Sequence, residues 1–326
     1  MNKEKLNILV TGVGSEVGQG VIKAIRLSKY NCRIIGCDMN PDSAGFFMCD
    51  DYSLISPVIS ENYEESLFSL CREKKIDMII PTVDVESPVI SNLKSALEEE
   101  GIVAIVQPPE ILEIFLNKYN TYRFFKGNGV GVPETLKINE GTVKEIGSKL
   151  GFPMIIKPEH GQGSKSVYKI NNFNELNFLY EIIKDEDDYV AQSYIPSSQS
   201  EYTCAVFNCP SMTEPNIIVL RRQLENGTSW ISEVVFDDVL IDLCKKVSQL
   251  IDLEGAINIQ LRKFQNKPFI FEINPRYSST SGIRANCGFN DVEMAIDHFI
   301  HKKTPSKPEI RKKKILRYIE ELYIDL

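Results

Sequence analysis

The sequence has no hydrophobic run long enough to cross a membrane and no excess of positive charge. Its 326 residues carry a net charge of −8, which argues against nucleic acid as a main partner. The first residues lead directly into a predicted strand, without the pattern of a signal peptide. We therefore expect a cytoplasmic protein that binds neither nucleic acid nor membranes.

Closely spaced metal ligands and nucleophile patterns are also missing. The three histidines lack the spacing of a zinc site, and none of the eight cysteines forms a CxxC pair. Most cysteines lie inside apolar segments, so we expect reduced core residues. A content of 43% hydrophobic and 25% charged residues is otherwise typical of a globular chain, here with length for two or three domains.

Hydrophobic patterns over residues 6–106 alternate between strands and helices. Strands are expected at 6–12, 33–39, 76–82 and 102–108, and helices at 17–29, 63–75 and 87–101. Strands joined by crossover helices form a parallel, doubly wound α/β sheet. This predicts an N-terminal domain over residues 1–112.

The pattern then changes to α+β. Residues 108–129 are expected to be helical, and a strand, glycine loop and strand follow at 152–170. A helix at 172–185 and a strand at 189–195 come next. From 201 to 274 strands dominate around one helix at 237–252, which indicates a larger antiparallel sheet. The segment 311–326 is compatible with either a strand or a helix.

The segment FIFEINPRYSS, residues 269–279, has an unusual polar face. Phe269, Phe271 and Ile273 alternate as in a half-buried strand, which leaves Glu272 and Asn274 on the opposite face. Residues 255–264, GAINIQLRKF, alternate in the same way. There Ile257, Ile259 and Leu261 share one face, and Asn258, Gln260 and Arg262 share the other.

A hairpin of these two strands would combine their polar faces. A turn centred on Asn266 places Gln260 opposite Glu272 and Asn258 opposite Asn274. Amide and carboxylate oxygens together suit Mg²⁺, with nucleotide phosphates completing the coordination. Arg276 lies just beyond, as a rigid donor fork for phosphate.

Two glycine-rich segments suit phosphate as well. In TGVGSEVGQG a glycine turn precedes a helix and Asp38 ends the next strand, which is compatible either with a bound dinucleotide or with a tight turn that needs glycine for packing. In IIKPEHGQGSKSV, Lys157 precedes a loop containing Gly161, Gly163 and Ser164, whose backbone N–H groups could close over phosphates.

Taken in order, these elements resemble the ATP-grasp superfamily, and in particular its carbamoyl-phosphate synthetase large-subunit-like branch. The resemblance rests on Lys118, Lys157, the glycine loop, residues 192–195, Glu201, Gln260 and the segment EINPR followed by a serine-rich loop. It implies an ATP-grasp fold over residues 113–310, in which two α+β subdomains clamp ATP. The smaller subdomain is the lid at about 127–193, and the segment 311–326 packs on this domain.

The resemblance also implies roles for individual residues. Lys118 and Lys157 contact phosphates beneath the loop, and Glu201 binds the ribose. Arg276 stabilises the transferred phosphoryl group, and Arg222, with Arg221 as the alternative, contacts substrate or the γ-phosphate. The adenine contacts are Gln192, Ser193, Tyr194 and Ile195, and Leu261 is a further cofactor-binding residue. The ligands of two Mg²⁺ ions, or of Mn²⁺ in their place, are Gln260, Glu272 and Asn274.

The implied activity is that of a ligase. ATP phosphorylates a small-molecule carboxylate, and an amine displaces phosphate from the acylphosphate. The chain has room for one such unit and shows no glutaminase motif, so we expect a stand-alone ligase rather than a carbamoyl-phosphate synthetase. The alternatives are an NAD(P)-dependent oxidoreductase that uses the first glycine turn and a nucleotide-binding protein without turnover; formation of a homodimer stays open.

Two acidic residues near the N-terminal domain have two interpretations. Asp84 and Glu86 follow a predicted strand at the carboxyl edge of its sheet, where α/β proteins bind ligands. They either face the substrate cleft or cap the next helix.

Overall fold

The computed structural model describes residues 5–140, 142–161, 166–183, 188–196 and 201–324. Within these ranges no helix combines the length and apolar character that a membrane span requires. All the cysteines are free thiols, as expected from their place in apolar segments.

The N-terminal part is a five-stranded parallel sheet in the order β3-β2-β1-β4-β5. The strands are β1 (Leu6–Thr11), β2 (Cys32–Asp38), β3 (Asp51–Leu54), β4 (Met78–Ile80) and β5 (Val103–Ala104). Between them lie α1 (Glu16–Arg26), the 3₁₀ turn η1 (Ala44–Met48), α2 (Tyr63–Lys74), α3 (Ser87–Asn92) and α4 (Lys94–Glu99).

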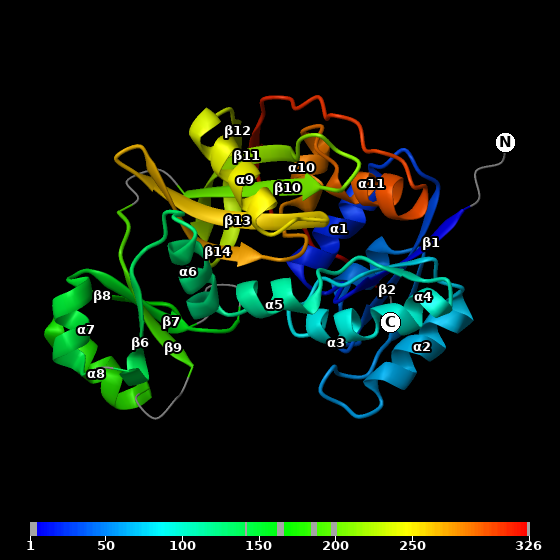
Figure 1. Ribbon diagram of the computed structural model, residues 1–326. Coiled ribbons are helices and arrows are strands. Elements are labelled where there is room, and N and C mark those ends of the chain that lie inside the picture. The colour runs from blue at the N-terminus through cyan, green and yellow to red at the C-terminus, as the bar shows by residue number, and fades with distance from the viewer. Residues whose placement is uncertain (1–4, 141, 162–165, 184–187, 197–200, 325–326) are drawn as a thin grey trace.

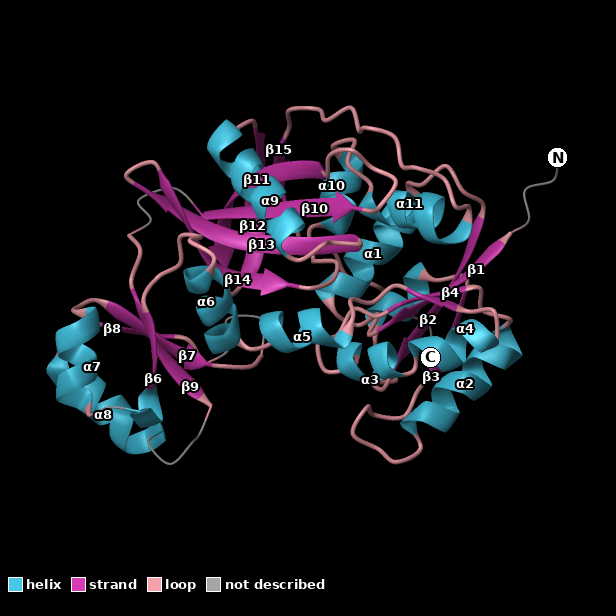
Figure 2. Cartoon of the chain, viewed as in Figure 1, coloured by secondary structure: helices cyan, strands magenta, loops and turns pink. Residues whose placement is uncertain are grey.

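Alternate residues of these strands enter two hydrophobic cores. Ile8 and Val10 pack with α1 on one face, whereas Leu9 packs with α2, α3 and α4 on the other. Helices on both faces of a parallel sheet (Figures 1 and 2) confirm the predicted doubly wound domain.

Two helices lead from this domain to a four-stranded antiparallel sheet in the order β6-β9-β7-β8. The helices are α5 (Pro109–Phe115) and α6 (Lys118–Gly127). The subdomain comprises β6 (Thr135–Lys137), the 3₁₀ turn η2 (Ile138–Glu140), α7 (Val143–Leu150), β7 (Met154–Pro158), β8 (Tyr168–Ile170), α8 (Phe173–Ile183) and β9 (Tyr189–Ser193). It has its own hydrophobic core and lies apart from the larger sheet in Figure 1.

A six-stranded antiparallel sheet in the order β14-β13-β10-β11-β12-β15 forms the third part. It comprises β10 (Glu201–Asn208), β11 (Asn216–Glu225), β12 (Thr228–Val235), β13 (Gly255–Phe264), β14 (Lys267–Asn274) and β15 (Lys314–Leu316). The helices here are α9 (Asp238–Leu250), α10 (Ser281–Asn286) and α11 (Asp291–Ala295), which continues as the π-helix η3 (Ile296–Ile300). The predicted larger antiparallel sheet is thus confirmed.

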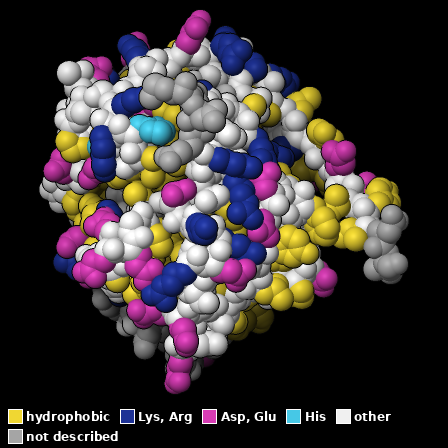
Figure 3. Space-filling model, turned by 90° about the vertical axis from the view of Figure 1, so that its right-hand side faces the viewer, with side chains coloured by type: hydrophobic (Ala, Val, Ile, Leu, Met, Phe, Trp, Pro, Cys, Tyr) yellow, Lys and Arg dark blue, Asp and Glu magenta, His cyan; other side chains and the backbone are white. Residues whose placement is uncertain are grey.

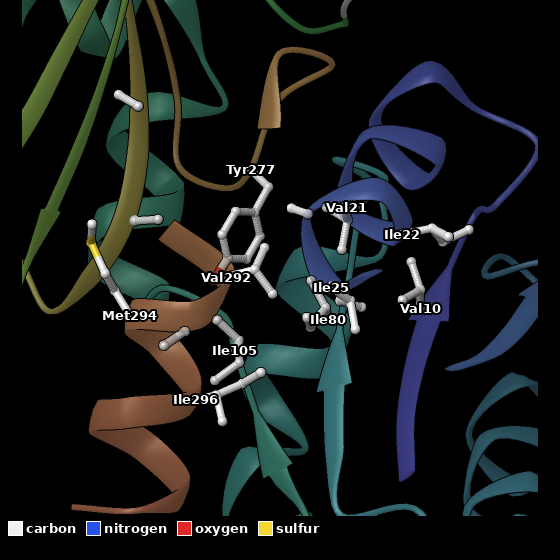
Figure 4. Close-up of a cluster of buried hydrophobic side chains, with 14 of the residues drawn as sticks. Val10, Val21, Ile22, Ile25, Ile80, Ile105, Tyr277, Val292, Met294 and Ile296 are labelled. Carbon is white, nitrogen blue, oxygen red and sulfur yellow. The ribbon is translucent and has the colours of Figure 1, made fainter. Parts of the chain in front are cut away.

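The N-terminal domain and the large sheet share one hydrophobic core. Tyr277 and Val292 lie next to Val21 and Ile25 of α1 in Figure 4. At this junction a Cβ on Gly20 would lie 3.3 Å from the carbonyl oxygens of Ser278 and Ser279. Helix α1 therefore packs directly on the serine-rich loop, and the last glycine of the first glycine segment serves this close contact.

Several elements differ from the sequence prediction. The helix expected at 87–101 is two helices that meet at Leu93, and the one expected at 108–129 is divided at Asn117, whose side chain caps α6. Strands β3 and β6 and helices α7, α10 and α11 lay outside the expected elements. The segment 311–326, left open between strand and helix, contains the short strand β15.

Candidate active site

A cavity lies where the four-stranded sheet faces the β13–β14 hairpin. Nine of the predicted residues line it: Lys118, Lys157, Gly161, Gln192, Ser193, Ile195, Glu201, Gln260 and Glu272. Its other lining residues are Pro133, Ile155, Pro158, His160, Val167, Leu224, Arg262 and Phe271. Residues far apart in the sequence thus converge on one pocket whose lining combines charged and apolar side chains.

Other predicted residues lie elsewhere. Leu261 is a correction, because its side chain is fully buried in the hydrophobic cluster on the opposite face of the sheet from the cavity. Tyr194 stacks with Lys169, whose Nζ is 4.7 Å from the ring centroid, and does not line the cavity. Gly163 and Ser164 fall outside the described residues.

Two lysines supply the positive charge of the cavity. Lys157, on β7, donates to Oε1 of Gln192 at 3.0 Å and to the carbonyl of Phe271 at 3.3 Å. Burial lowers the pKa of Lys157 to about 8, although the carboxylate of Glu272 opposes this effect. Lys118, at the start of α6, donates to the carbonyl of Gly161 at 2.8 Å, and burial also lowers its pKa. A nearby phosphate would stabilise the protonated form of both ammonium groups.

The pairing of β13 with β14 is as predicted near Gln260 and Glu272, but the turn that leads to it differs from the prediction. Gln260 pairs with Glu272 and Asn258 with Asn274. The turn, however, is a tight two-residue turn in which Gln265 and Asn266 both have positive φ (48° and 62°). A register shift between Gln260 and Leu261 then restores the predicted pairing.

This irregularity changes the orientation of Phe271. The alternation in the sequence predicts Phe271 on the core face together with Ile273. Instead Phe271 lines the cavity beside Glu272, while Ile270 and Ile273 enter the core. The extra residue therefore adds an aromatic ring to the pocket.

Two of the predicted metal ligands accept hydrogen bonds from arginine side chains. Oε1 of Gln260 accepts from Arg222 Nη2 at 2.7 Å, and Oδ1 of Asn274 accepts from Arg276 Nη2 at 3.3 Å. An amide oxygen has two lone pairs, so each can still bind a cation. The described residues hold no group of three His, Cys, Asp or Glu side chains suited to a metal, so a metal site here would combine Glu272 with amide oxygens. These hard oxygen donors fit Mg²⁺.

Glu201 lies between two arginines. Its Oε1 accepts from Arg222 Nη2 at 2.9 Å, and its Oε2 accepts from Nη2 and Nε of Arg262 at 2.9 and 3.1 Å. Arg222 is buried and bridges Glu201 to Gln260, whereas Arg221, the alternative, pairs with Glu233 at 2.5 Å on the other face of the sheet. A ribose bound by Glu201 would thus share this carboxylate with two guanidinium groups.

Arg276 connects the site to the N-terminal domain. Its Nε donates to Oδ1 of Asp84, and its Nη1 to the carbonyl of Tyr277 at 2.7 Å. Asp84 therefore faces Arg276, and α3 begins without a side-chain cap bond. Glu86 is buried, accepts from the Thr11 hydroxyl, and has a pKa raised to about 7 by burial. Of the two acidic residues, Asp84 thus contacts a predicted site residue, whereas Glu86 is buried against Thr11.

Nearby groups of the protein itself occupy the space around the first glycine turn. Asp38 accepts from the backbone N–H of Gly14 at 2.8 Å and of Asn40 at 3.0 Å. A Cβ on Gly14 would lie 2.5 Å from Oγ of Ser43, and one on Gly45 would lie 1.9 Å from the Val13 carbonyl oxygen. The acid that would receive a ribose hydroxyl thus binds its own turn, which favours the packing interpretation over a dinucleotide site.

Some lining residues were not assigned a role from the sequence. Arg262 was placed on the correct face, but its pairing with Glu201 depends on the adjacent strand β10. His160 bonds to the Leu116 carbonyl at 3.1 Å, a contact across 44 residues of sequence that no local pattern shows. Phe271 was missed because the alternation assumes an unbroken strand.

Comparison with known families defines the class of protein. Residues 186–322 match a family model described as ATP-grasp in the biosynthetic pathway with Ter operon, and residues 8–105 match a PylC-like N-terminal domain. The chain therefore carries an ATP-grasp domain preceded by a PylC-like N-terminal domain.

Individual relatives agree with this assignment. An uncharacterized protein of Methanocaldococcus jannaschii is 28% identical over 84% of this chain and 69% of its own length. The carbamoyl phosphate synthase large chain of a Thermoanaerobacter species is 23% identical over 91% of this chain, which spans only 29% of that protein. The second match confirms the predicted resemblance to the large subunit of carbamoyl-phosphate synthetase.

A solved structure shows the same fold. The N5-carboxyaminoimidazole synthetase from Staphylococcus aureus, complexed with ADP, has a TM-score of 0.76 at 18% identity. The match covers 95% of this chain and 82% of that one. The arrangement of an α/β domain, a small sheet and a large antiparallel sheet is thus common to both proteins.

Proposed function

We propose that this protein is an ATP- and Mg²⁺-dependent ligase that activates a small-molecule carboxylate as an acylphosphate for attack by an amine. The observation that carries the proposal is the convergence of Lys118, Lys157, Gln260 and Glu272 on one cavity. Two cations and a set of hard oxygen donors, with an apolar wall beside them, match a nucleoside triphosphate. The ADP bound to the similar Staphylococcus aureus protein supports a nucleotide as the ligand.

The apolar part of the cavity lining suits the base. Ile155, Val167, Leu224 and Phe271 line the cavity, as do Ser193 at the end of β9 and Ile195 just beyond it. Lys157 bonds between the two sheets, and its Nζ lies 5.7 Å from the centroid of the Phe271 ring. We infer that the adenine packs on Phe271 and that the phosphates extend toward Lys118 and Lys157.

In the reaction, an oxygen of the substrate carboxylate attacks the γ-phosphorus, the bond to the β–γ bridging oxygen breaks, and ADP leaves. The amine then adds to the acyl carbon, phosphate leaves, and the amine loses a proton. Arg276 orients the transferred phosphoryl group, and Arg222 holds Gln260 and Glu201 in place. Such chemistry needs positioning and charge neutralisation rather than a nucleophilic side chain.

Gln260, Glu272 and Asn274 would hold the metal ions, two in number, through their amide and carboxylate oxygens. The bound cations supply neutralising charge for the triphosphate. The hydrogen bonds from Arg222 and Arg276 to the two amide oxygens fix the direction of these oxygens, as outer-shell partners do at other metal sites.

The experiment is a panel of carboxylates and amines screened for the release of ADP and phosphate with Mg²⁺. We expect release that requires one carboxylate and one amine together. ATP binding without ADP release for any pair would instead identify a nucleotide-binding protein without turnover. Replacing Mg²⁺ with Mn²⁺ in the same assay tests whether either ion serves.

A further inference from the structure

A second feature of the molecule lies far from the cavity. Beyond β15 the chain continues as an arm, residues 317–324, without regular secondary structure. Its apolar side chains are mostly in solvent: Tyr318 is 79% exposed, Ile319 77% and Tyr323 89%. In Figure 3 the arm projects from the right-hand side of the body. So large an apolar exposure in one short segment is typical of an interaction surface.

The strand before the arm lies at the edge of a sheet. β15 pairs with β12 on one side and is the last strand in the order of the six-stranded sheet. The backbone groups on its outer side face no further strand among the described residues. An edge of this kind can accept another strand.

The charges along β15 and the arm are complementary to each other. The strand side carries Lys312, Lys313 and Lys314, and the arm carries Glu320 and Glu321. All of these side chains are exposed. Lysines on an edge strand oppose pairing with most strands, but they favour an acidic one.

We propose that the arm of one molecule pairs antiparallel with β15 of a second copy, and the reverse, so that two large sheets join across a twofold axis. A register centred on Arg317 places Lys314 opposite Glu320 of the other copy and Lys313 opposite Glu321. The partner is a second copy of this chain, because the basic strand and the acidic arm that complement each other both belong to one sequence.

The same register also pairs the apolar residues. Leu316 meets Tyr318 of the other copy, and Ile315 meets Ile319. Opposite residues in an antiparallel pair lie on the same face of the sheet. A twofold axis through Arg317 therefore agrees with the side-chain alternation of both strands. The interface is isologous, so each contact occurs twice.

At the axis itself, Arg317 is held by its own molecule. Its Nη2 donates to the Ser279 carbonyl at 2.7 Å, its Nη1 is 3.6 Å from Oε2 of Glu16, and its backbone N–H donates to the Trp230 carbonyl at 3.0 Å. The two arginines are thus directed into their own domains, which keeps their charges apart.

The test uses the full chain and its mass in solution, measured by sedimentation equilibrium over a range of concentrations. We expect the unchanged protein to be a dimer. The double variant Glu320→Lys/Glu321→Lys makes both segments basic, and Lys313→Glu/Lys314→Glu makes both acidic. Each variant alone should be a monomer, and an equal mixture of the two should form a mixed dimer.

The matched control is Glu64→Lys/Glu65→Lys on α2, which makes the same charge change on an exposed helix face and should leave the dimer intact. Thermal unfolding and ATP binding report that each variant is folded. A monomeric unchanged protein, or double variants that remain dimers, would overturn the proposal. So would a mixture of folded variants that stays monomeric.

Discussion

Lys157 holds an ammonium group where burial opposes its charge. Its pKa of about 8 lies below the ordinary value of 10.5. Between these two pH values the unfolded chain binds a proton that the folded chain lacks, so the free energy of unfolding rises with pH through this window. Below pH 8 the folded protein carries the full cost of a buried charge.

A bound triphosphate offsets the cost of burying this charge, because an anion favours the protonated lysine. At a pH just above 8, we expect ATP binding to take up a proton, and ATP affinity to fall as the pH rises further. Calorimetry in buffers of different ionisation enthalpy measures the uptake. Lys157→Met should reduce it, while Lys149→Met on exposed α7 should leave it unchanged. Equal uptake in both variants would contradict the role of Lys157.

The second prediction at this scale concerns Glu272. Glu272→Gln keeps the size of the side chain but removes the charge that the metal ions need. We expect turnover to fall by at least about 10²–10³-fold, with the fold unchanged. The control is Glu225→Gln, at the exposed end of β11. Mg²⁺-dependent turnover at the normal rate in Glu272→Gln would rule out the metal assignment.

Among the elements, the β13–β14 hairpin shows what a sequence pattern can and cannot predict. The alternation in β13 correctly separates Ile257 and Ile259 from Gln260, because that strand is regular. β14 contains no glycine, and its proline, Pro268, is the second residue of the strand and does not mark the irregularity near Phe271, so the extra residue stays invisible in the sequence. The break of the helix at Asn117 did have a local cause, since asparagine is a good N-cap.

The irregular strand leads to a prediction that compares neighbouring residues. Phe271 lines the cavity, whereas Ile270 lies in the core. Phe271→Ala should weaken ATP binding by about 1–3 kcal/mol, the range for a base stacked on an aromatic ring. Ile270→Ala should instead lower the free energy of unfolding by about 2–5 kcal/mol. ATP titration and denaturant unfolding of both variants measure this, and the opposite pattern would place Phe271 in the core.

On the scale of the whole molecule, the site depends on contacts that no local pattern contains. Asp84 and Arg276 are 192 residues apart in the sequence and meet across the junction between the N-terminal domain and the large sheet. The sequence indicated the carboxyl edge of the first sheet as a place for ligands, and it indicated Arg276 beside phosphate. The two meet because the N-terminal domain and the large sheet share one core, in which α1 packs on the serine-rich loop.

This junction separates the roles of two carboxylates at the edge of the first sheet. Asp84 binds Arg276, so Asp84→Asn should lower kcat by about 10–100-fold, as expected for a residue that orients another functional group, and leave ATP affinity nearly unchanged. Asp38 accepts hydrogen bonds from the backbone of Gly14 and Asn40 in its own turn, so Asp38→Ala should leave ATP affinity within about 0.5 kcal/mol and kcat unaltered. Steady-state kinetics with titrations of ATP and NADH measure both effects. NADH binding that is lost in Asp38→Ala would mean that the first glycine turn, and not the cavity, holds the cofactor.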